Sequence, residues 1–154
     1  MDLGDLISPD AVVAELRAKS KKQALQALAE TAADLTGLPE REIFDTLLQR
    51  ERLGSTGIGQ GVAIPHGKLA SLKKITAIFA RLAEPIDFEA VDGQPVDLVF
   101  VLLAPENAGA DHLKALARIS RLLRETSSME KLRSSKDESA LYSILTEEAT
   151  SHAA

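Results

Sequence analysis

The sequence predicts a single α/β domain in which helices and strands form layers. Segments with helical periodicity alternate with short apolar segments, which is typical of a sheet covered by helices. Residues 96–103 are almost continuously apolar, as in a central strand that is buried on both faces. A chain of 154 residues with 45% hydrophobic residues is long enough for one core. We therefore expect one domain over 1–154, with its core over about 6–145 and a frayed tail over 147–154.

Two helices are predicted in the first third of the chain. The first follows Ser20, because the spacing of Ser20 and Gln23 matches a capping box, and Gly37 ends it. Pro39 begins the second helix, which carries Arg50 near its C-terminal end. The apolar residues of the first helix recur at helical spacing: Leu25, Leu28, Ala29, Ala32 and Leu35.

Short apolar segments predict the remaining strands. Residues 62–64 and 75–82 are each predicted to be strands, whereas residues 12–18 fit either a short strand or a helical turn. Residues 85–95 are rich in turn-forming residues, and Asp92–Gly93 is the expected tight turn.

The last third of the chain is predicted to be helical. Asp111 is the expected N-cap of a helix that begins near His112. Two shorter helices are predicted over 128–133 and 137–145. The first of the three helices has an apolar stripe made of Leu113, Leu116, Ala117, Ile119, Leu122 and Leu123.

Composition excludes several classes of function. The net charge is −5 and aromatic residues are only 3%, which argues against a nucleic-acid partner. The absence of cysteine excludes a disulfide framework, a thiol nucleophile and a cysteine-ligated metal. No apolar stretch approaches the roughly 20 residues that span a bilayer, and the acidic start of the chain is too polar for a signal peptide. We expect a cytoplasmic protein without direct membrane insertion.

The residues from Gly54 to Leu69 read GSTGIGQGVAIPHGKL and are the most informative part of the chain. Pro65 restricts the backbone before His66, and Gly67 has no side chain to crowd the imidazole. A nucleophile that must meet a bulky anionic donor needs this arrangement, although a histidine that only packs in a turn is the alternative. The segment is not a P-loop, because Leu69 follows the Gly-Lys pair where Ser or Thr is required.

This segment resembles the active-site segment of the type-2 enzyme IIA proteins of the bacterial phosphotransferase system. The nitrogen-regulatory branch is the most similar, since its pattern GSTGIGxGIAIPHGKL is nearly matched by Gly54 to Leu69. The resemblance runs from about Leu6 to Leu145 and implies a mixed β-sheet flanked by helices. It also implies that His66 accepts a phosphoryl group from a small histidine phosphocarrier. The family carries this group on Nε2, but the residues alone do not show which nitrogen reacts.

The resemblance assigns two further residues to the site. His112 matches a second active-site histidine, which would bind the phosphoryl group or the first histidine. Arg50 matches an arginine that would contact phosphate, with Arg52 and Lys68 as rivals. Without the resemblance, His112 would be a surface residue at a helix start and Arg50 a helix C-terminal arginine favoured by the dipole.

The glycine-rich loop is the candidate for holding phosphate oxygens. Its backbone N–H groups could form an anion-binding nest beside two hydroxyl groups, and an ordinary turn is an equal alternative. An amide at position 60 favours the regulatory branch, because mannitol-type relatives tend to carry Glu there. Neither a metal nor a cofactor is expected, since Asp92, Asp97 and Asp111 lack metal-ligand spacing. The loop candidates are Ser55, Thr56, Gly57, Gly59, Gln60 and Gly61.

These observations favour a phosphocarrier that regulates other proteins through its phosphorylation state. The expected donor is a nitrogen-type histidine phosphocarrier, and the expected targets are proteins such as potassium transporters or sensors. One alternative is a sugar-specific enzyme IIA of a fructose- or mannitol-type transporter. Another is an interaction module that has kept the fold without the chemistry.

Overall fold

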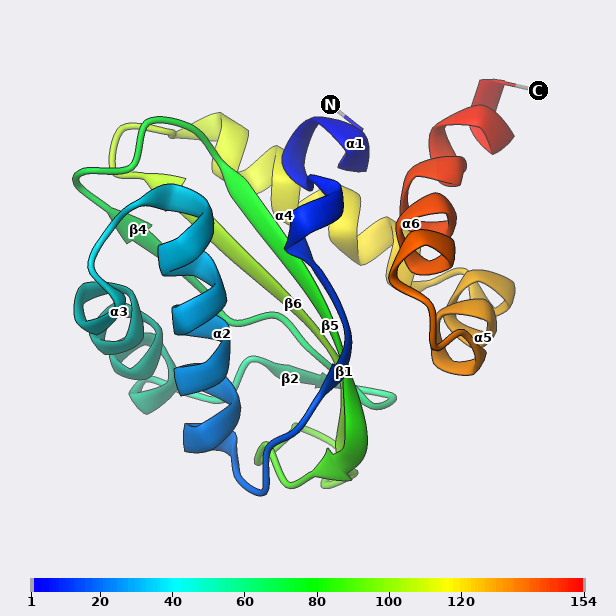
Figure 1. Cartoon of the computed structure of the whole chain (residues 1–154), viewed down its shortest axis with the longest axis horizontal. Coiled ribbons are helices and arrows are strands. Elements are labelled where there is room, and N and C mark those ends of the chain that lie inside the picture. Colours follow the sequence, from blue (N-terminus) through cyan, green and yellow to red (C-terminus); the bar gives the residue numbers. More distant parts are fainter. Residues whose placement is uncertain (1, 154) are drawn as a thin grey trace.

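The computed structural model describes the backbone of residues 2–153 and the side chains of residues 2–147. In this part of the chain, a six-stranded mixed sheet forms the centre, in the order β1-β5-β6-β3-β2, with β4 also paired to β6 (Figure 1). The pairings of β1 with β5 and of β3 and β4 with β6 are parallel, and those of β5 with β6 and of β2 with β3 are antiparallel. The predicted fold class is thus confirmed. The strands are β1 (Val12–Leu16), β2 (Gly57–Gly59), β3 (Val62–Ala63), β4 (His66–Leu69), β5 (Thr76–Ile86) and β6 (Val96–Pro105).

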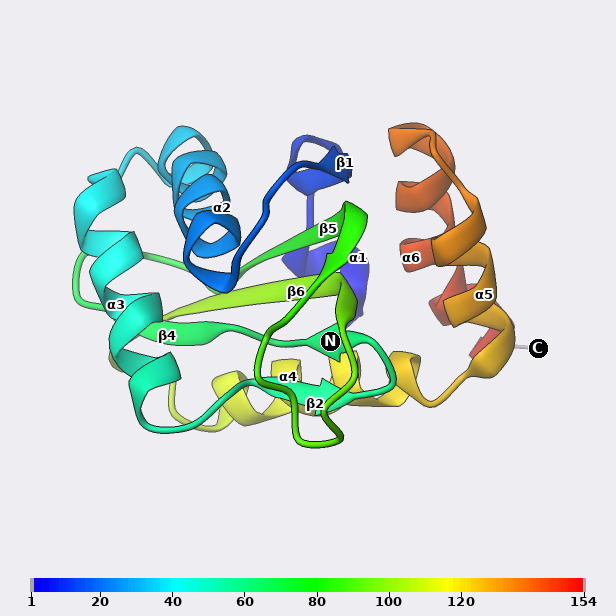
Figure 2. The same ribbon diagram turned by 90° about the horizontal axis from the view of Figure 1, so that it is seen from below.

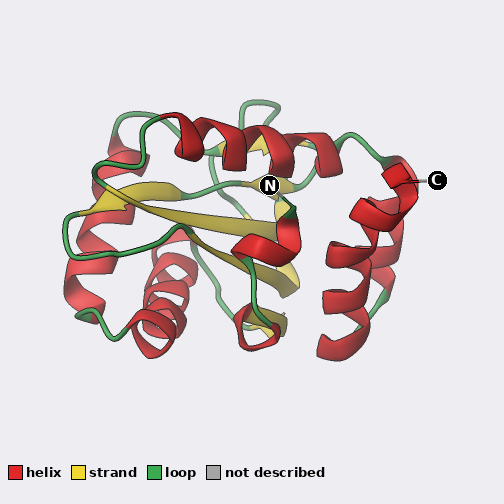
Figure 3. Cartoon of the chain, turned by 90° about the horizontal axis from the view of Figure 1, so that it is seen from above, coloured by secondary structure: helices red, strands yellow, loops and turns green. Residues whose placement is uncertain are grey.

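Helices cover the sheet on both sides. Figure 2 shows α2 and α4 on opposite sides of the sheet, α3 beside β4, and α5 and α6 together at the far end. The N-terminal α1 packs against α4 and α6 (Figure 3). Its residues Leu3 and Leu6 are buried. The helices are α1 (Leu3–Leu6), the 3-10 helix η1 (Pro9–Ala11), α2 (Lys21–Thr36), α3 (Glu40–Arg52), α4 (Ala110–Leu123), α5 (Thr126–Ser134) and α6 (Glu138–Ala153).

The predicted central strand is β6. Except for Asp97, its residues are buried, and it pairs on one side with β5 and on the other with β3 and β4. Phe100 in β6 packs edge-on against Phe79 in β5, with their ring centroids 4.9 Å apart. Aromatic pairs in this geometry stabilise a core beyond the area they bury.

Strands β3 and β4 act as one interrupted strand beside β6. Ala63 pairs with Val99 and His66 with Leu102, so the register of the two pairings is the same. The break falls at Pro65, which has no N–H to donate, while the Pro65 carbonyl still accepts from the Leu102 N–H at 2.9 Å. The backbone of His66 is therefore fixed to the central strand directly after the break.

The ends of α2 follow the predicted signals. Ser20 Oγ accepts from the Gln23 N–H at 3.2 Å, and Gly37 ends the helix in the left-handed region with φ 77°. The Gln23 side chain differs from a capping box, because its Oε1 accepts from the Lys19 N–H and not from that of Ser20.

Several element boundaries differ from the predictions. Residues 12–16 are a strand, which settles the open alternative, and β5 continues through Pro85 with a register shift between Arg81 and Ile86. The N-cap of α4 is Gly109, and Asp111 lies in the first turn. The last helix, α6, is longer than the predicted 137–145 and runs to Ala153, and the fraying predicted for 147–154 stays a prediction.

The buried face of α4 is also rotated from the predicted stripe. Leu113 and Ala117 are exposed, whereas His112, Ala115 and Arg118 are buried. The predicted stripe included Leu113 because it was drawn through apolar residues alone. The buried face of α4 contains a histidine and an arginine, so it is centred on a different side of the helix.

Candidate functional site

An open pocket of about 580 Å³ lies where the end of α3, strand β4 and the start of α4 meet. It brings together the three predicted residues His66, His112 and Arg50, each from a different element. Arg52 and Lys68, the predicted rivals of Arg50, also line it. The other lining residues are Thr46, Gln49, Leu53 and Gly67.

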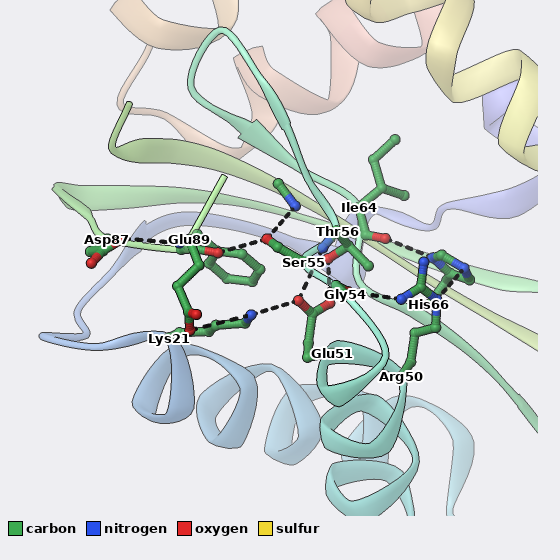
Figure 4. A network of polar contacts seen from close by, with 12 residues as sticks. Lys21, Arg50, Glu51, Gly54, Ser55, Thr56, Ile64, His66, Asp87 and Glu89 are labelled. Carbon is green, nitrogen blue, oxygen red and sulfur yellow. Dashed lines mark hydrogen bonds and ion pairs between the residues drawn. The ribbon is translucent and has the colours of Figure 1, made fainter. Parts of the chain in front are cut away.

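The imidazole of His66 is held from both of its nitrogen atoms (Figure 4). Nδ1 lies 2.8 Å from the carbonyl oxygen of Ile64, which can only accept, so Nδ1 carries the proton. Nε2 then bears the free electron pair, and the Nε–H of Arg50 donates to it at 3.3 Å. The hydrogen-bond partners thus assign one neutral tautomer, with Nε2 as the nucleophilic nitrogen.

Arg50 lies at the open side of this imidazole. It belongs to the last turn of α3, and its Nη1 donates to the carbonyl oxygen of Gly54 at 2.9 Å. One side of the guanidinium is therefore anchored to the backbone while Nε contacts His66. A planar donor group in this position suits the oxygens of an anion bound at Nε2.

His112 lies edge-on to His66, with ring centroids 5.8 Å apart and an interplanar angle of 66°. It is 9% exposed, and within the described part of the chain its Nε2 has no hydrogen-bond partner. Burial lowers the pKa of His112 below its ordinary value, and the positive charge of Lys68, and of His66 whenever its ring is protonated, lowers it further. A neutral imidazole with an unpartnered nitrogen is suited to bind a group that enters the pocket.

This geometry is found in a chain with clear relatives. A family model described as "Phosphoenolpyruvate-dependent sugar phosphotransferase system, EIIA 2" matches residues 5–148. The chain belongs to the EIIA 2 family. The "Nitrogen regulatory protein" of Bradyrhizobium diazoefficiens is 63% identical over 145 residues, which cover 94% of this chain and 95% of that relative. The resemblance to a nitrogen-regulatory enzyme IIA is thereby confirmed.

Solved structures agree with the EIIA 2 assignment. The crystal structure of Nitrogen Regulatory Protein IIA-Ntr from Neisseria meningitidis superposes with a TM-score of 0.88 at 38% identity, covering 94% of this chain and 99% of that one. The crystal structure of IIA mannitol from Escherichia coli superposes with a TM-score of 0.76 at 20% identity, covering 90% and 97%. This second likeness concerns the fold alone. Within the described residues, no helix combines the length and apolar character that a membrane span requires.

In this EIIA 2 protein the hydroxyl groups of Ser55 and Thr56 form hydrogen bonds within the protein. Ser55 Oγ donates to the carbonyl oxygen of Phe88 at 2.7 Å and accepts from the Gly57 N–H at 3.0 Å. Thr56 Oγ1 donates to the carboxylate of Glu51. Both hydroxyl groups therefore shape the loop, and neither lines the histidine pocket.

The rest of the glycine-rich loop forms a β-hairpin away from the pocket. Gln60 and Gly61, with φ angles of 57° and 80°, make the turn between β2 and β3. The Gln60 N–H donates to Asp92, and its carbonyl oxygen accepts from Arg133 at 2.5 Å. The structure does not bring Gly57, Gly59, Gln60 or Gly61 to His66.

Glu51 is a buried charged residue next to Arg50 that was not among the residues predicted from the sequence. It is 6% exposed, and its carboxylate accepts from Thr56 and pairs with Lys21 at 2.9 Å. A signal existed in the sequence, because Glu51 continues the buried spacing of Ile43 and Leu47 along α3. A carboxylate at a position that periodicity assigns to the core requires a partner.

Gly67 is required by a close approach of α3 to β4. A β-carbon at Gly67 would lie 2.6 Å from Cγ2 of Thr46, whose hydroxyl is bonded to the carbonyl oxygen of Glu42 at 2.9 Å. We expect Gly67→Ala to destabilise the protein by about 1–3 kcal/mol, as overpacking does. Adding Thr46→Ser removes that methyl group and should restore most of the loss in urea unfolding. A double variant no more stable than Gly67→Ala would contradict this explanation.

The lowered pKa of His112 predicts a pH-dependent stability. The unfolded chain binds a proton near the ordinary pKa of 6.5, whereas the folded protein binds it only at lower pH. The free energy of unfolding should therefore decrease as the pH falls below 6.5 towards the folded pKa, with no such loss above 6.5. Urea unfolding between about pH 7.5 and 5.5 should show a smaller decrease for His112→Gln than for the unchanged protein. Equal decreases in both proteins would contradict the prediction.

Proposed function

We propose that this protein is a cytoplasmic histidine phosphocarrier of the nitrogen-type phosphotransferase system. The observation that carries the proposal is the neutral His66, whose Nε2 bears its electron pair beside Arg50 and His112 in one pocket. The nitrogen-regulatory relative supports the choice of branch. The donor would be a small histidine phosphocarrier that is itself charged from phosphoenolpyruvate.

His66 does not have to lose a proton when its Nε2 attacks the phosphoryl group, because Nε2 already bears a free electron pair. The electron pair of His66 Nε2 forms the new N–P bond, while the N–P bond of the donor phosphohistidine breaks and its electron pair returns to the donor imidazole. Nδ1–H stays bonded to the Ile64 carbonyl, which stabilises the positive charge that develops on the ring. Arg50 would exchange its contact with Nε2 for the phosphoryl oxygens, and His112 Nε2 would gain the partner that it lacks.

Regulation would follow from the change in charge. A phosphoryl group adds about −1.5 to −2 charges at an open pocket, which alters the proteins that can dock there. We propose regulatory targets such as potassium-transport or sensor proteins. The sugar-specific alternative differs in the donor and in an onward transfer to an enzyme IIB.

The test is loading with phosphate in a defined mixture. The protein would be incubated with phosphoenolpyruvate, nitrogen-type enzyme I and its phosphocarrier. Its intact mass would then be measured before and after mild acid treatment. We expect a single acid-labile phosphate on the unchanged protein and none on His66→Ala. Failure to load from a donor shown to be charged would overturn the proposal, and loading from a sugar-type donor alone would favour the alternative.

A further inference from the structure

Glu51 occupies a position from which it can control the reactive histidine without touching it. We propose that Glu51 is a positioning residue that keeps His66 in the tautomer with a free Nε2, acting through Thr56 and Ile64. This inference rests on the proposed function for its effect on phosphate transfer. Its effect on the tautomer can be measured independently.

The first step is a pair of hydrogen bonds from Thr56, in the loop after α3, to the carboxylate of Glu51. The Thr56 N–H donates to Glu51 Oε1 at 3.1 Å, and Thr56 Oγ1 donates to Oε2 of the same carboxylate. All three groups are buried, where such bonds are strong and their loss is costly. Glu51 thus fixes both the backbone and the side chain of Thr56.

The second step passes from Thr56 to the imidazole along the backbone. The carbonyl oxygen of Thr56 accepts from the Ile64 N–H at 2.9 Å. The carbonyl oxygen of Ile64 then accepts from His66 Nδ1 at 2.8 Å. The orientation of residue 64, and with it the group that selects the tautomer, therefore depends on where Thr56 is held (Figure 4).

The last turn of α3 consequently acts on both nitrogen atoms of His66. Arg50 contacts Nε2 directly, and the next residue, Glu51, supports the acceptor of Nδ1, the Ile64 carbonyl, through Thr56. Successive residues of a helix point in different directions, so one turn can reach both sides of the ring.

The charge of Glu51 is compensated from α2. Lys21 Nζ lies 2.9 Å from Glu51 Oε1 and 5.0 Å from the ring centroid of Phe88, and its side chain is only 16% exposed. The carboxylate accepts from all of its neighbours, whereas an amide can keep the contact with Thr56 Oγ1 only by donating to it, and it leaves the ammonium group of Lys21 without a charged partner. Glu51→Gln therefore disrupts the network at almost unchanged volume.

The test compares three variants by ¹⁵N spectra of the His66 ring and by the rate of phosphate loading. Glu51→Gln should give a mixture of tautomers and load about tenfold or more slowly, as misplaced support of a reactive histidine does. Thr56→Val removes Oγ1 at nearly equal size and should act in the same direction. Thr56→Ser retains the hydroxyl group and should keep the tautomer and the rate of the unchanged protein.

Glu89→Gln is the matched control. Glu89 also pairs with Lys21, at 3.9 Å, but its side chain is 77% exposed. This variant makes the same change of charge and should leave the tautomer and the loading rate unaltered. Urea unfolding would be measured for all variants to correct each rate for the folded fraction.

The outcomes separate the two proposals. A single Nδ1–H tautomer in folded Glu51→Gln and Thr56→Val, with loading rates within twofold of the unchanged protein, would overturn the role of Glu51. A loss of stability without a change of tautomer would also overturn it, since that result indicates a merely structural role. Failure of the unchanged protein to take phosphate would refute the proposed function, while the tautomer spectra would still decide the role of Glu51.

Discussion

Arg50→Gln is expected to slow the loading of His66 by about a hundredfold to a thousandfold, the usual loss when a donor to developing charge is removed. In the structure Arg50 Nε donates to His66 Nε2, and Nη1 is anchored to Gly54. Once a phosphoryl group occupies Nε2, its oxygens would be the natural partners of the same guanidinium. Glutamine retains a donor but has neither the charge nor the forked geometry. The initial rate of loading, followed by intact mass, is the measurement.

Two further variants test whether the effect depends on the planar guanidinium of Arg50 or only on a positive charge in the pocket. Arg50→Lys keeps the charge without the planar fork, so it should load at an intermediate rate. Arg52→Gln removes an exposed arginine that lines the same pocket, and it should load within a few-fold of the unchanged protein. Equal losses for Arg50→Gln and Arg52→Gln would show that the pocket uses only its summed positive charge, which would contradict the role given to Arg50.

Phe100→Ala is expected to have the largest effect on stability, a loss of about 3–5 kcal/mol in the free energy of unfolding. Phe100 is 1% exposed, lies in the central strand and contacts the ring of Phe79. Truncation would leave a cavity beside the Phe79 ring on one face of the sheet, and close packing around it limits how far the core can collapse into it. Since domains are stable by only about 5–15 kcal/mol, the variant should unfold at much lower urea concentration.

Leu53→Ala is the control for this second prediction. Leu53 is 85% exposed at the rim of the histidine pocket, so its truncation should change the free energy of unfolding by less than about 0.5 kcal/mol. A loss below about 1 kcal/mol for Phe100→Ala would contradict the central position of β6 in the core.

Most of the longer helices of this chain could be predicted from the sequence, because their signals are local. Ser20 and Gly37 bound α2 as predicted, because a capping hydroxyl and a left-handed glycine act on the residues beside them. The strands of two to four residues, β2, β3 and β4, carry little periodicity of their own. Whether they are strands depends on their partners, so β2 and β4 were missed. The cap of α4 was assigned to Asp111 by propensity, whereas the chain turns into this helix at Gly109, whose φ is 56°.

The sequence by itself was enough to select His66, His112 and Arg50 as the candidate site residues, because they stand in a recognisable order and context, and the structure brings them into one pocket. Only the tertiary structure decided how these groups are arranged. The choice of tautomer depends on the carbonyl of Ile64, a residue whose N–H is bonded to the Thr56 carbonyl across the hairpin of β2 and β3. Other contacts between separate segments place the buried Glu51 beside Lys21 and bond Gln60 of the hairpin to Asp92 and Arg133, away from the pocket. Hydrogen bonds and burial arise between segments that meet only in the folded chain, and a pattern of residue types does not contain them.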